Sequence, residues 1–324
     1  MMKRFFVLCA AFCCVSLVLG CKKGGDGKTD YPRRNITMIC PWAAGGGTDS
    51  ILRALSAAAE KELGVTITVE NKTGGAGAIG HAAIKNAKPD GYTVGMITFE
   101  LNSLPPQGLI DFTYADYDPL IRVNSDAATL TVKGDAPYNS IKEFVEYCKQ
   151  NPGAVSIGNS APGSVWHIGA GLLANETGID VKHIAFEGGA AAVTALAGGH
   201  IQAVTVSLAE VKSQLDAGNV KCLGVMDTKR SELYPNIPTF IEEGYNIVYS
   251  TWRGLALPKG VKPEIKAVLV DAFSKAMENP DFIEKARNMN LALAYLPPGE
   301  FAVFLKDNYE SVERTLRETH LLEE

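Results

Sequence analysis

The strongest constraint on the fold is a regular alternation of short β-branched runs with helix-forming segments. Strand patterns occupy residues 36–42, 66–71 and 93–98. Helical patterns fill the intervals between them, near residues 48–63 and 79–87. This alternation predicts βαβ units, and therefore a parallel sheet with right-handed crossovers. The chain has 324 residues, enough for about two domains that each bury a core.

A second alternating series follows an irregular stretch at residues 101–117, a strand pattern at 120–132 and a helix that begins at the capping box Ser140–Glu143. Its strands are expected at residues 155–159, 183–186, 202–207 and 220–226, and its helices near 165–176, 190–197 and 209–217. Helical patterns at 263–278 and 300–318 finish the chain. Two α/β series with a helical return predict two sheet domains that the chain crosses more than once.

The N-terminal segment, residues 1–20, is typical of an export signal. Lys3 and Arg4 precede an uncharged apolar run that is short for a transmembrane helix and typical of a signal-peptide core. Apolar and small residues then precede Cys21, as in a bacterial lipobox, so we expect cleavage before Cys21 and lipidation of its thiol. Residues 21–33 should form a flexible tether. The alternative is a plain signal peptide with an incidental cysteine.

Charge and cysteine usage narrow the function classes. The chain has 31 basic and 36 acidic residues, a formal net charge of −5, whereas a nucleic-acid binder normally shows a basic field. Beyond the signal and Cys21, the cysteines are Cys40, Cys148 and Cys222, with no CxxC pair. We therefore expect no disulfide framework, no metal site and no cofactor.

Two glycine-rich loops lie between a strand and a helix in the first series. Gly75-Ala76-Gly77-Ala78-Ile79-Gly80 is a literal GxGxxG, and Glu100 lies 20 residues beyond Gly80, so an NAD-dependent oxidoreductase is one interpretation. Two features disfavour it. An exported protein rarely meets that cofactor, and residues 41–49 form a similar loop where the fingerprint predicts none.

The two loops have the same physical content. Small residues let a ligand approach the backbone, and the N–H groups at a helix N-terminus carry partial positive charge. Two such helix ends side by side predict a site for a carboxylate or phosphate that needs no Lys or Arg. The alternative is that the glycines only permit tight turns; two loops in adjacent units favour a shared anion site.

The second series has a matching loop, which begins at Gly158 after a strand. Ser164 can cap the next helix, while Ser160 and His167 can donate to a ligand oxygen. A serine hydrolase is the rival interpretation, but Gly158-x-Ser160-x-Pro162 lacks the second glycine of a nucleophile elbow. His167 as an ordinary capping or interface residue remains open.

Two further loops follow strands of this series, at residues 186–189 and 206–208. Open α/β sheets place ligands at the carboxyl ends of their strands, so these loops should border the same site. The candidates for its apolar walls, each of which is alternatively a core residue, are Trp42, Trp166, Phe186 and Trp252.

An ordered set of motifs carries a family resemblance. The motifs occupy residues 41–49, 69–77, 90–93, 163–167, 198–203, 236–239, 243–244 and 252–258. Together they resemble the extracytoplasmic substrate-binding proteins of tripartite tricarboxylate transporters, the Bug-type family, from about Ile36 to the C-terminus. The resemblance implies an α/β, two-lobed type II periplasmic-binding-protein fold with a ligand cleft between the lobes. Residues 34–124 plus 250–324 would form lobe 1, and 125–249 lobe 2.

The function implied is that of a monomeric, non-enzymatic receptor. It would capture a small organic carboxylate and present it to one large and one small integral membrane subunit, while held by its lipid anchor at the periplasmic or outer face of the cell membrane. In the first lobe the site residues implied are Ala43, Ala44, Gly45, Gly46, Thr48, Asp49, Gly74, Gly75, Ala76, Gly77 and Thr98. In the second lobe they are Ser160, Ser164, His167, Phe186, Glu187, Gly188 and Ser207. A lipoprotein that signals through a partner is a further alternative.

Two residues depart from the family pattern. Glu187 stands where many members carry a basic residue, which points toward an amine-bearing or less charged ligand. Trp252-Arg253 replaces the commoner Trp-Tyr pair. Arg253 is interpreted either as a cation near the hinge or as a surface residue.

Overall fold

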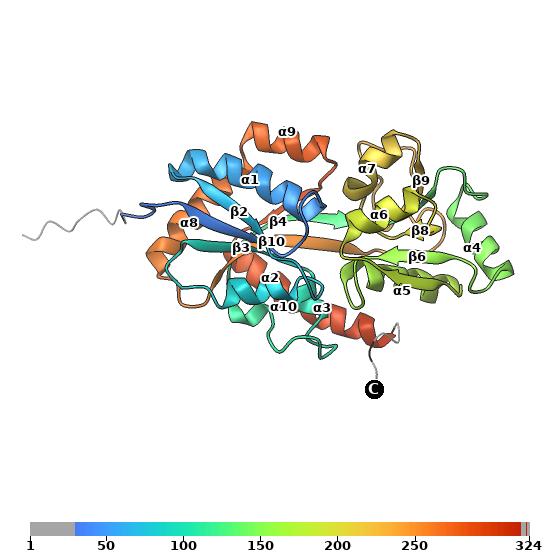
Figure 1. The fold of residues 1–324 in the computed structure, drawn as a ribbon, viewed down its shortest axis with the longest axis horizontal. Coiled ribbons are helices and arrows are strands. Elements are labelled where there is room, and N and C mark those ends of the chain that lie inside the picture. The colour runs from blue at the N-terminus through green and yellow to red at the C-terminus, as the bar shows by residue number, and fades with distance from the viewer. Residues whose placement is uncertain (1–29, 319–321, 323–324) are drawn as a thin grey trace, which may run out of the picture. The chain divides into compact units, whose positions relative to one another are not determined.

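The strands form two separate sheets in the computed structural model, which describes residues 30–318 and 322 (Figure 1). All elements belong to the unit formed by Tyr31–Glu324. We call the six-stranded sheet with its helices the first lobe and the five-stranded sheet with its helices the second lobe. The proposed signal peptide and the lipidation site Cys21 lie outside the described residues. The expected tether, residues 21–33, enters the described part of the chain at Asp30. Within it, the Tyr31 hydroxyl donates a hydrogen bond to the Gly91 carbonyl.

The first lobe contains the sheet β11-β4-β10-β3-β1-β2. In that order its strands are Leu293–Leu296, Tyr117–Ala127, Ser250–Pro258, Thr93–Thr98, Ile36–Cys40 and Ile67–Asn71. β1 pairs in parallel with β2 and β3, as the alternating pattern predicts. β10 and β11, which the sequence did not reveal as strands, join in antiparallel pairing. The sheet is therefore mixed.

The helices of the first lobe cover both faces of this sheet (Figure 1). They are α1 (Gly47–Leu63), α2 (Ala78–Lys85), α3 (Glu100–Ser103), α8 (Pro263–Met277), α9 (Pro280–Asn288) and α10 (Pro298–Glu318), with a 3-10 turn at Tyr114–Asp116. Met38 packs in the core beneath α1 and α8, while Ile39 packs in the core that includes α2 and α10. Because successive strand residues face opposite layers, β1 has apolar residues on both faces, and Thr37 is its one polar residue.

The second lobe contains the sheet β7-β6-β8-β5-β9. In that order its strands are Lys182–Ala185, Ser156–Asn159, Ala203–Val204, Thr129–Lys133 and Val220–Val225. Its helices are α4 (Ile141–Gln150), α5 (Val165–Thr177), α6 (Gly189–Ala197) and α7 (Leu208–Asp216). β6 is parallel to both its neighbours, and β5 is antiparallel to β8 and β9.

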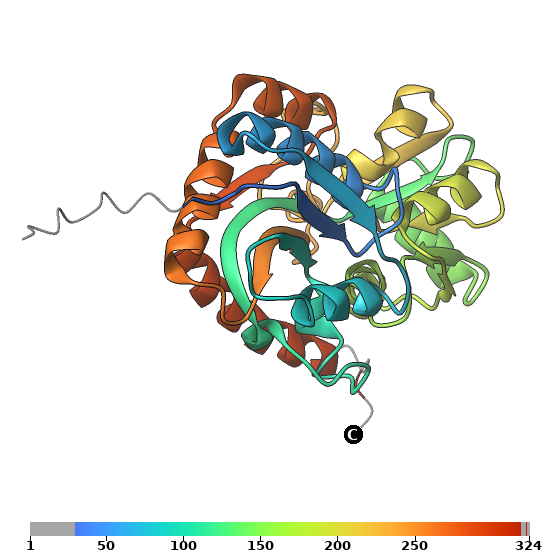
Figure 2. The same ribbon diagram turned by 60° about the vertical axis from the view of Figure 1, so that its left-hand side comes forward.

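Two segments connect the lobes and lie side by side. The expected strand at residues 120–132 is two strands, β4 and β5, on either side of Ala128, and each belongs to a different sheet. Ala127 pairs with Ser250 at the start of β10, and the Ala128 N–H donates to the Tyr249 carbonyl at 2.9 Å. In Figure 2, β4 curves around β10. Paired connecting strands of this kind are the natural place for a hinge.

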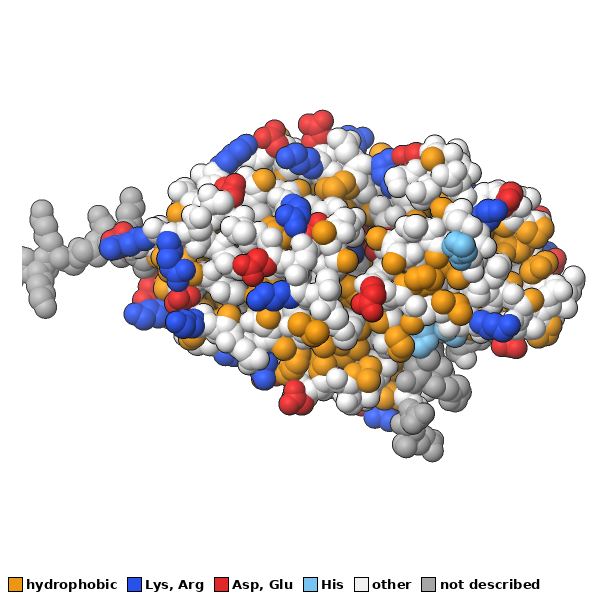
Figure 3. All heavy atoms as spheres, in the orientation of Figure 1, with side chains coloured by type: hydrophobic (Ala, Val, Ile, Leu, Met, Phe, Trp, Pro, Cys, Tyr) orange, Lys and Arg blue, Asp and Glu red, His pale blue; other side chains and the backbone are white. Residues whose placement is uncertain are grey.

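The surface seen in Figure 3 mixes basic and acidic side chains over the first lobe. Hydrophobic side chains gather on the same face near α2 and α3, and Ile79 and Leu109 are among the exposed apolar residues of the molecule. None of the described helices combines the length and the apolar character that a membrane crossing requires.

Candidate functional site

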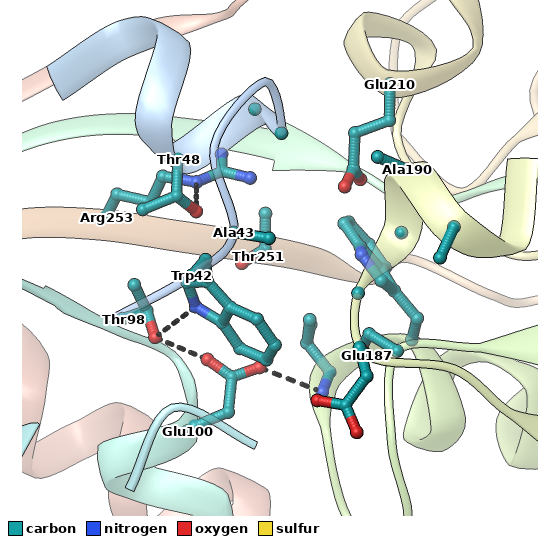
Figure 4. A pocket seen from close by; sticks show the side chains of 18 residues that line it. Trp42, Ala43, Thr48, Thr98, Glu100, Glu187, Ala190, Glu210, Thr251 and Arg253 are labelled. Atoms are coloured by element: carbon teal, nitrogen blue, oxygen red, sulfur yellow. Dashed lines mark hydrogen bonds between the residues drawn. The ribbon is translucent and has the colours of Figure 1, made fainter. Parts of the chain in front are cut away.

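A pocket of about 90 Å³ is lined by residues of both lobes (Figure 4). Its first-lobe residues are Trp42, Ala43, Gly46, Gly47, Thr48, Thr98, Glu100, Thr251 and Arg253. Its second-lobe residues are Ser160, Val165, Trp166, Glu187, Gly188, Gly189, Ala190, Ala191 and Glu210. Seven predicted site residues are therefore brought together here: Ala43, Gly46, Thr48, Thr98, Ser160, Glu187 and Gly188.

The first glycine loop is shaped by a buried carboxylate. Asp49 accepts hydrogen bonds from the Gly45 N–H at 3.0 Å, from Arg53 Nε at 3.0 Å and from Asn71 Nδ2 at 2.8 Å. Burial alone would raise the pKa of Asp49, but the hydrogen bonds from Arg53, Gly45 and Asn71 lower it. Asp49 and Gly45 therefore hold the loop, which also includes Ala44, while their neighbours line the pocket.

The N-terminus of α1 opens onto the pocket. Its N-cap is Gly46, which has no side chain to cap the helix, and the next two residues, Gly47 and Thr48, both line the pocket. The first N–H groups of a helix have no partner within the helix and carry partial positive charge. This edge of the pocket therefore favours an anion.

Arg253 stands beside that helix end. Its Nε donates to Thr48 Oγ1 at 2.8 Å, and its Nη1 forms an ion pair with Asp126 at 2.5 Å. Both charged side chains are 4% exposed. The interpretation of Arg253 as a surface residue is therefore wrong: it is a buried cation on β10, beside the strands that connect the lobes.

The second glycine loop has a different role in the structure. Among the described residues, Gly74, Gly75, Ala76 and Gly77 are not part of the pocket lining. The Gly77 N–H donates to the Gly74 carbonyl at 3.1 Å, and the Ala78 N–H donates to Gly75 at 3.0 Å, so part of the backbone closes its own turn. That these four residues contact the ligand stays a prediction, which the lining of this pocket does not support.

Close packing explains the last glycine of the GxGxxG pattern. A Cβ on Gly80 would lie 2.5 Å from Pro41 Cα and 2.7 Å from the Lys72 carbonyl oxygen. Both atoms belong to the backbone and have little room to move. The spacing that resembles a dinucleotide fingerprint thus has a structural reason, which is that the two loops pack against each other.

Glu100 links the two lobes, a role the sequence did not suggest. It is 1% exposed and follows β3 of the first lobe. Its Oε2 accepts from Thr98 Oγ1 at 2.5 Å, and its Oε1 accepts from the Val165 N–H at the start of α5 in the second lobe, at 3.2 Å. Trp42 Nε1 donates to the same Thr98 hydroxyl at 3.4 Å (Figure 4). A protein carboxylate therefore occupies the N-terminus of α5.

The serine–histidine loop of the second lobe is held by local hydrogen bonds. Ser160 Oγ and Ser164 Oγ lie 2.7 Å apart, and Ser164 donates to the Ala161 carbonyl. His167 Nδ1 accepts the Gly163 N–H at 3.0 Å. Burial and the neighbouring His183 lower the pKa of His167 to about 4, so its ring is neutral at pH 7.

Of the three predicted residues in this loop and helix, one contacts the pocket and two support the loop. Ser160 lines the pocket, whereas Ser164 and His167 lie behind it and fix the loop. The hydrolase interpretation needs a histidine base bonded to a serine. Here the Nδ1 atom of His167 is bonded to a backbone N–H.

The remaining predicted residues of the second lobe also divide into contact and support. Glu187 and Gly188 line the pocket, while Phe186 packs over Gly158 and Ser207 caps α7. Ser207 forms a capping box with Glu210, whose Oε2 accepts from the Ser207 N–H and hydroxyl, both at 3.3 Å. Glu210 reaches the pocket as well. The Ser-x-x-Glu spacing was the signal that could have revealed it.

Trp42 and Trp166 supply apolar walls of the pocket, as predicted. Trp252 does not: it is 1% exposed, its Nε1 donates to Asn308 Oδ1 at 2.8 Å, and its ring packs edge-on against Phe301. Trp252 therefore belongs to the core of the first lobe.

The pocket is acidic for a site expected to hold an anion. Its lining includes three glutamates, Glu100, Glu187 and Glu210, against Arg253, which is itself paired with Asp126. Burial raises the pKa of Glu100, Glu210 and Asp126, and the guanidinium of Arg253 opposes the shift in each. The positive charge of Arg253 therefore acts on all three of these carboxyl groups.

Comparisons with known proteins bear on the family and the fold of the chain. A family model described as the tripartite tricarboxylate transporter family receptor matches residues 51–321. A Cupriavidus necator protein described as "UPF0065 protein in gbd 5'region" is 30% identical over 307 residues, which cover 94% of each chain. A solved TctC solute-binding protein from Polaromonas is 38% identical, with a TM-score of 0.69, over 89% of this chain and 99% of that one.

The periplasmic binding protein BugD is 27% identical, with a TM-score of 0.86, over 91% of this chain and all of that one (100%). These likenesses confirm the two-lobed periplasmic-binding-protein fold expected from the sequence motifs.

Proposed function

Because the chain belongs to the tripartite tricarboxylate transporter receptor family, we propose that it captures a small organic carboxylate in the pocket between its lobes and delivers it to a transporter. The family consists of solute receptors, so the chain is a binding protein and the oxidoreductase and hydrolase interpretations are dropped. The transporter would contribute the large and small integral subunits that the family resemblance implies.

One observation carries the proposal: the uncapped N-terminus of α1 meets the buried guanidinium of Arg253 inside a pocket lined by both lobes. Helix N–H groups and a guanidinium are both good partners for a carboxylate. Two solved structures of other proteins with the same fold contain a carboxylate, which supports this ligand class. They are Rpa4515 of Rhodopseudomonas palustris with adipate, TM-score 0.84, and MatC of the same species with malate, TM-score 0.81.

Ligand binding would act through lobe closure. A solute that touches both lobes binds the closed form more tightly, and so shifts the population toward it. Hydrogen bonds that cross between the lobes away from the connecting strands include Val165 N–H to Glu100, Gln107 Nε2 to the Gly163 carbonyl at 3.1 Å, and Ser231 Oγ to Asn290 Oδ1 at 3.1 Å. These contacts would help to hold the closed form around the ligand.

We further propose residues 34–124 plus 250–324 as lobe 1 and 125–249 as lobe 2; the exchange of sheets before Ser250 supports the second boundary, and the exchange between Ala127 and Thr129 lies a few residues beyond the first. The receptor would be a monomer outside the cytoplasm, exported by residues 1–20 and anchored through a lipid on Cys21. Mass spectrometry of the mature N-terminus, with and without a signal-peptidase inhibitor, tests the anchor; an unmodified Cys21 contradicts it.

Calorimetric titration of the purified protein with mono-, di- and tricarboxylates, with NAD as the control ligand, tests the function. We expect one carboxylate class to bind and to raise the melting temperature by mass action, and NAD to do neither. If no carboxylate binds, the proposal fails. The prediction that His167→Ala weakens binding without unfolding the protein is tested in the same assay; unchanged affinity would remove His167 from the site.

A further inference from the structure

Opposite charges face each other across the pocket from the two lobes. Arg253 reaches it from β10 of the first lobe, and Glu210 reaches it from α7 of the second (Figure 4). Gly47 stands between them: a Cβ on Gly47 would lie 3.1 Å from Arg253 Nη2 and 3.6 Å from Glu210 Cγ. Arg253 and Glu210 do not form an ion pair; the partner of Arg253 is Asp126.

The first-lobe side of this gap is built for an anion. Arg253 is 4% exposed, and its Nε and Nη1 are committed to Thr48 and Asp126. The Nη2 group points to the pocket beside Gly47, and no hydrogen bond to another described residue engages it. A guanidinium N–H that no acceptor of the described chain engages can donate to a ligand carboxylate, and such charge-assisted hydrogen bonds are strong.

The second-lobe side is built for a cation. Glu187 is exposed at the pocket, and within the described part of the chain no hydrogen bond or ion pair holds its carboxylate. Glu210 uses Oε2 for the Ser207 cap, while its Oε1 lies against Gly189 at the pocket wall. A ligand with negative charge at both ends would bring its second carboxylate toward these two glutamates, and like charges at short range repel.

We propose that the ligand of this pocket carries a protonated amine as well as a carboxylate, as an amino acid does, with the carboxylate toward Arg253 and the α1 N-terminus and the ammonium toward Glu187 and Glu210. The inference rests on the proposed solute-receptor function and specifies its substrate class. It also explains why the pocket lining has an excess of glutamates in a receptor that we propose to bind an acid. An ammonium group offsets the mutual repulsion of the glutamates, and the ligand that carries it contacts both lobes.

Matched ligand pairs test the inference by calorimetric titration. The pairs are L-aspartate with L-malate, L-glutamate with L-2-hydroxyglutarate, and L-alanine with L-lactate, so that the members differ in an ammonium against a hydroxyl group. For the chain length that binds best, we expect the amino acid to bind at least about tenfold more tightly than its hydroxy acid. A hydroxy acid that binds equally well or better overturns the inference and leaves the carboxylate receptor standing. Binding of no compound in the panel overturns both.

Charge-removing variants assign the selectivity to the two glutamates. Glu187→Gln and Glu210→Gln should each lower the ratio of amino-acid to hydroxy-acid affinity, and Gln at position 210 can still serve the capping box, so α7 should fold. Glu146→Gln, an exposed change on α4 of the same lobe, is the matched control and should keep the ratio. An unchanged ratio in both pocket variants overturns the inference.

Discussion

The two glycine-rich loops of the first lobe look alike in sequence, yet they do different things in the structure. The first loop places Gly46 and Gly47 at the pocket, next to Arg253. The second loop closes part of its backbone within its own turn and packs Gly80 against Pro41. A glycine pattern thus shows that something must approach the backbone closely, but whether that neighbour is a ligand or the chain itself depends on tertiary packing.

The difference teaches where a substitution should affect binding and where it should affect folding. Changes near the second loop should destabilise the protein and leave affinity alone, whereas changes at the first loop should lower affinity. Arg253 belongs to both classes, because it is part of the pocket and of a buried ion pair.

Arg253→Met gives the largest expected effect. The change leaves Asp126, whose side chain is 4% exposed, as a buried carboxylate without its cation. Loss of one partner of a buried pair typically costs about 3–5 kcal/mol, and we expect a loss of that size in the free energy of unfolding, measured by urea denaturation. The double variant Arg253→Met, Asp126→Asn should recover part of it because no bare charge remains. A single-variant loss below about 1 kcal/mol would contradict the buried pair.

Gly80→Ala should destabilise the protein through the second loop. The added methyl group would meet two backbone atoms, which move less easily than side chains, so we expect about 3 kcal/mol, at the upper end of the cost of overpacking. Ligand affinity should stay the same. The control is Gly299→Ala at the start of α10, where the new Cβ meets nothing within 4 Å. If Gly80→Ala weakens binding at full stability, the second loop contacts the ligand and the contrast between the loops fails.

Most of the alternating elements could be predicted because their patterns are local. The ends of α1 follow from small residues before the helix and Gly64 after it, which adopts the left-handed conformation at φ 68°. Strand β10 was not predicted, because nearly all of its residues are buried and its sequence shows no alternation. Gly254 also interrupts the pattern, at a position where a Cβ would lie 2.3 Å from Phe301. Helix α9 was not predicted either, although Asn279-Pro280 is a helix-start signal.

The site was harder to predict than the fold. Loop residues such as Thr48 and Glu187 follow from the rule that ligands bind at the carboxyl ends of strands. Glu100, Glu210 and Arg253 reach the pocket from α3, α7 and β10, elements that are far apart in the chain. Only the packing of the two lobes brings their charges together, and no local pattern encodes that.

Acid should weaken the support of the second loop. His81 on α2 is fully buried, and burial lowers its pKa to about 3, whereas a histidine in the unfolded chain titrates near pH 6.5. Below pH 6.5 the unfolded chain binds a proton that the folded chain does not, so stability falls as the pH falls, until about pH 3. At pH 5 the cost from His81 is about 2 kcal/mol.

Urea denaturation of the wild type and His81→Gln between pH 7.5 and pH 5 measures this cost, because the difference in slope isolates His81 from other titrating groups. Gln can still accept the Thr98 N–H that His81 Nε2 now accepts. Parallel slopes would show that His81 is not buried as a neutral ring.

Gly47→Ala gives the smallest change in free energy and the sharpest test of the contrast between the loops. Gly47 is the first residue of α1 and its backbone lies outside the left-handed region, so Ala is tolerated there and stability should change by less than about 1 kcal/mol. The new methyl group would lie 3.1 Å from Arg253 Nη2, where we place the ligand carboxylate. We therefore expect about tenfold weaker binding, or about 1.4 kcal/mol, in the calorimetric assay. Wild-type affinity in Gly47→Ala would mean that the first loop, like the second, has its glycines for packing and not for a ligand.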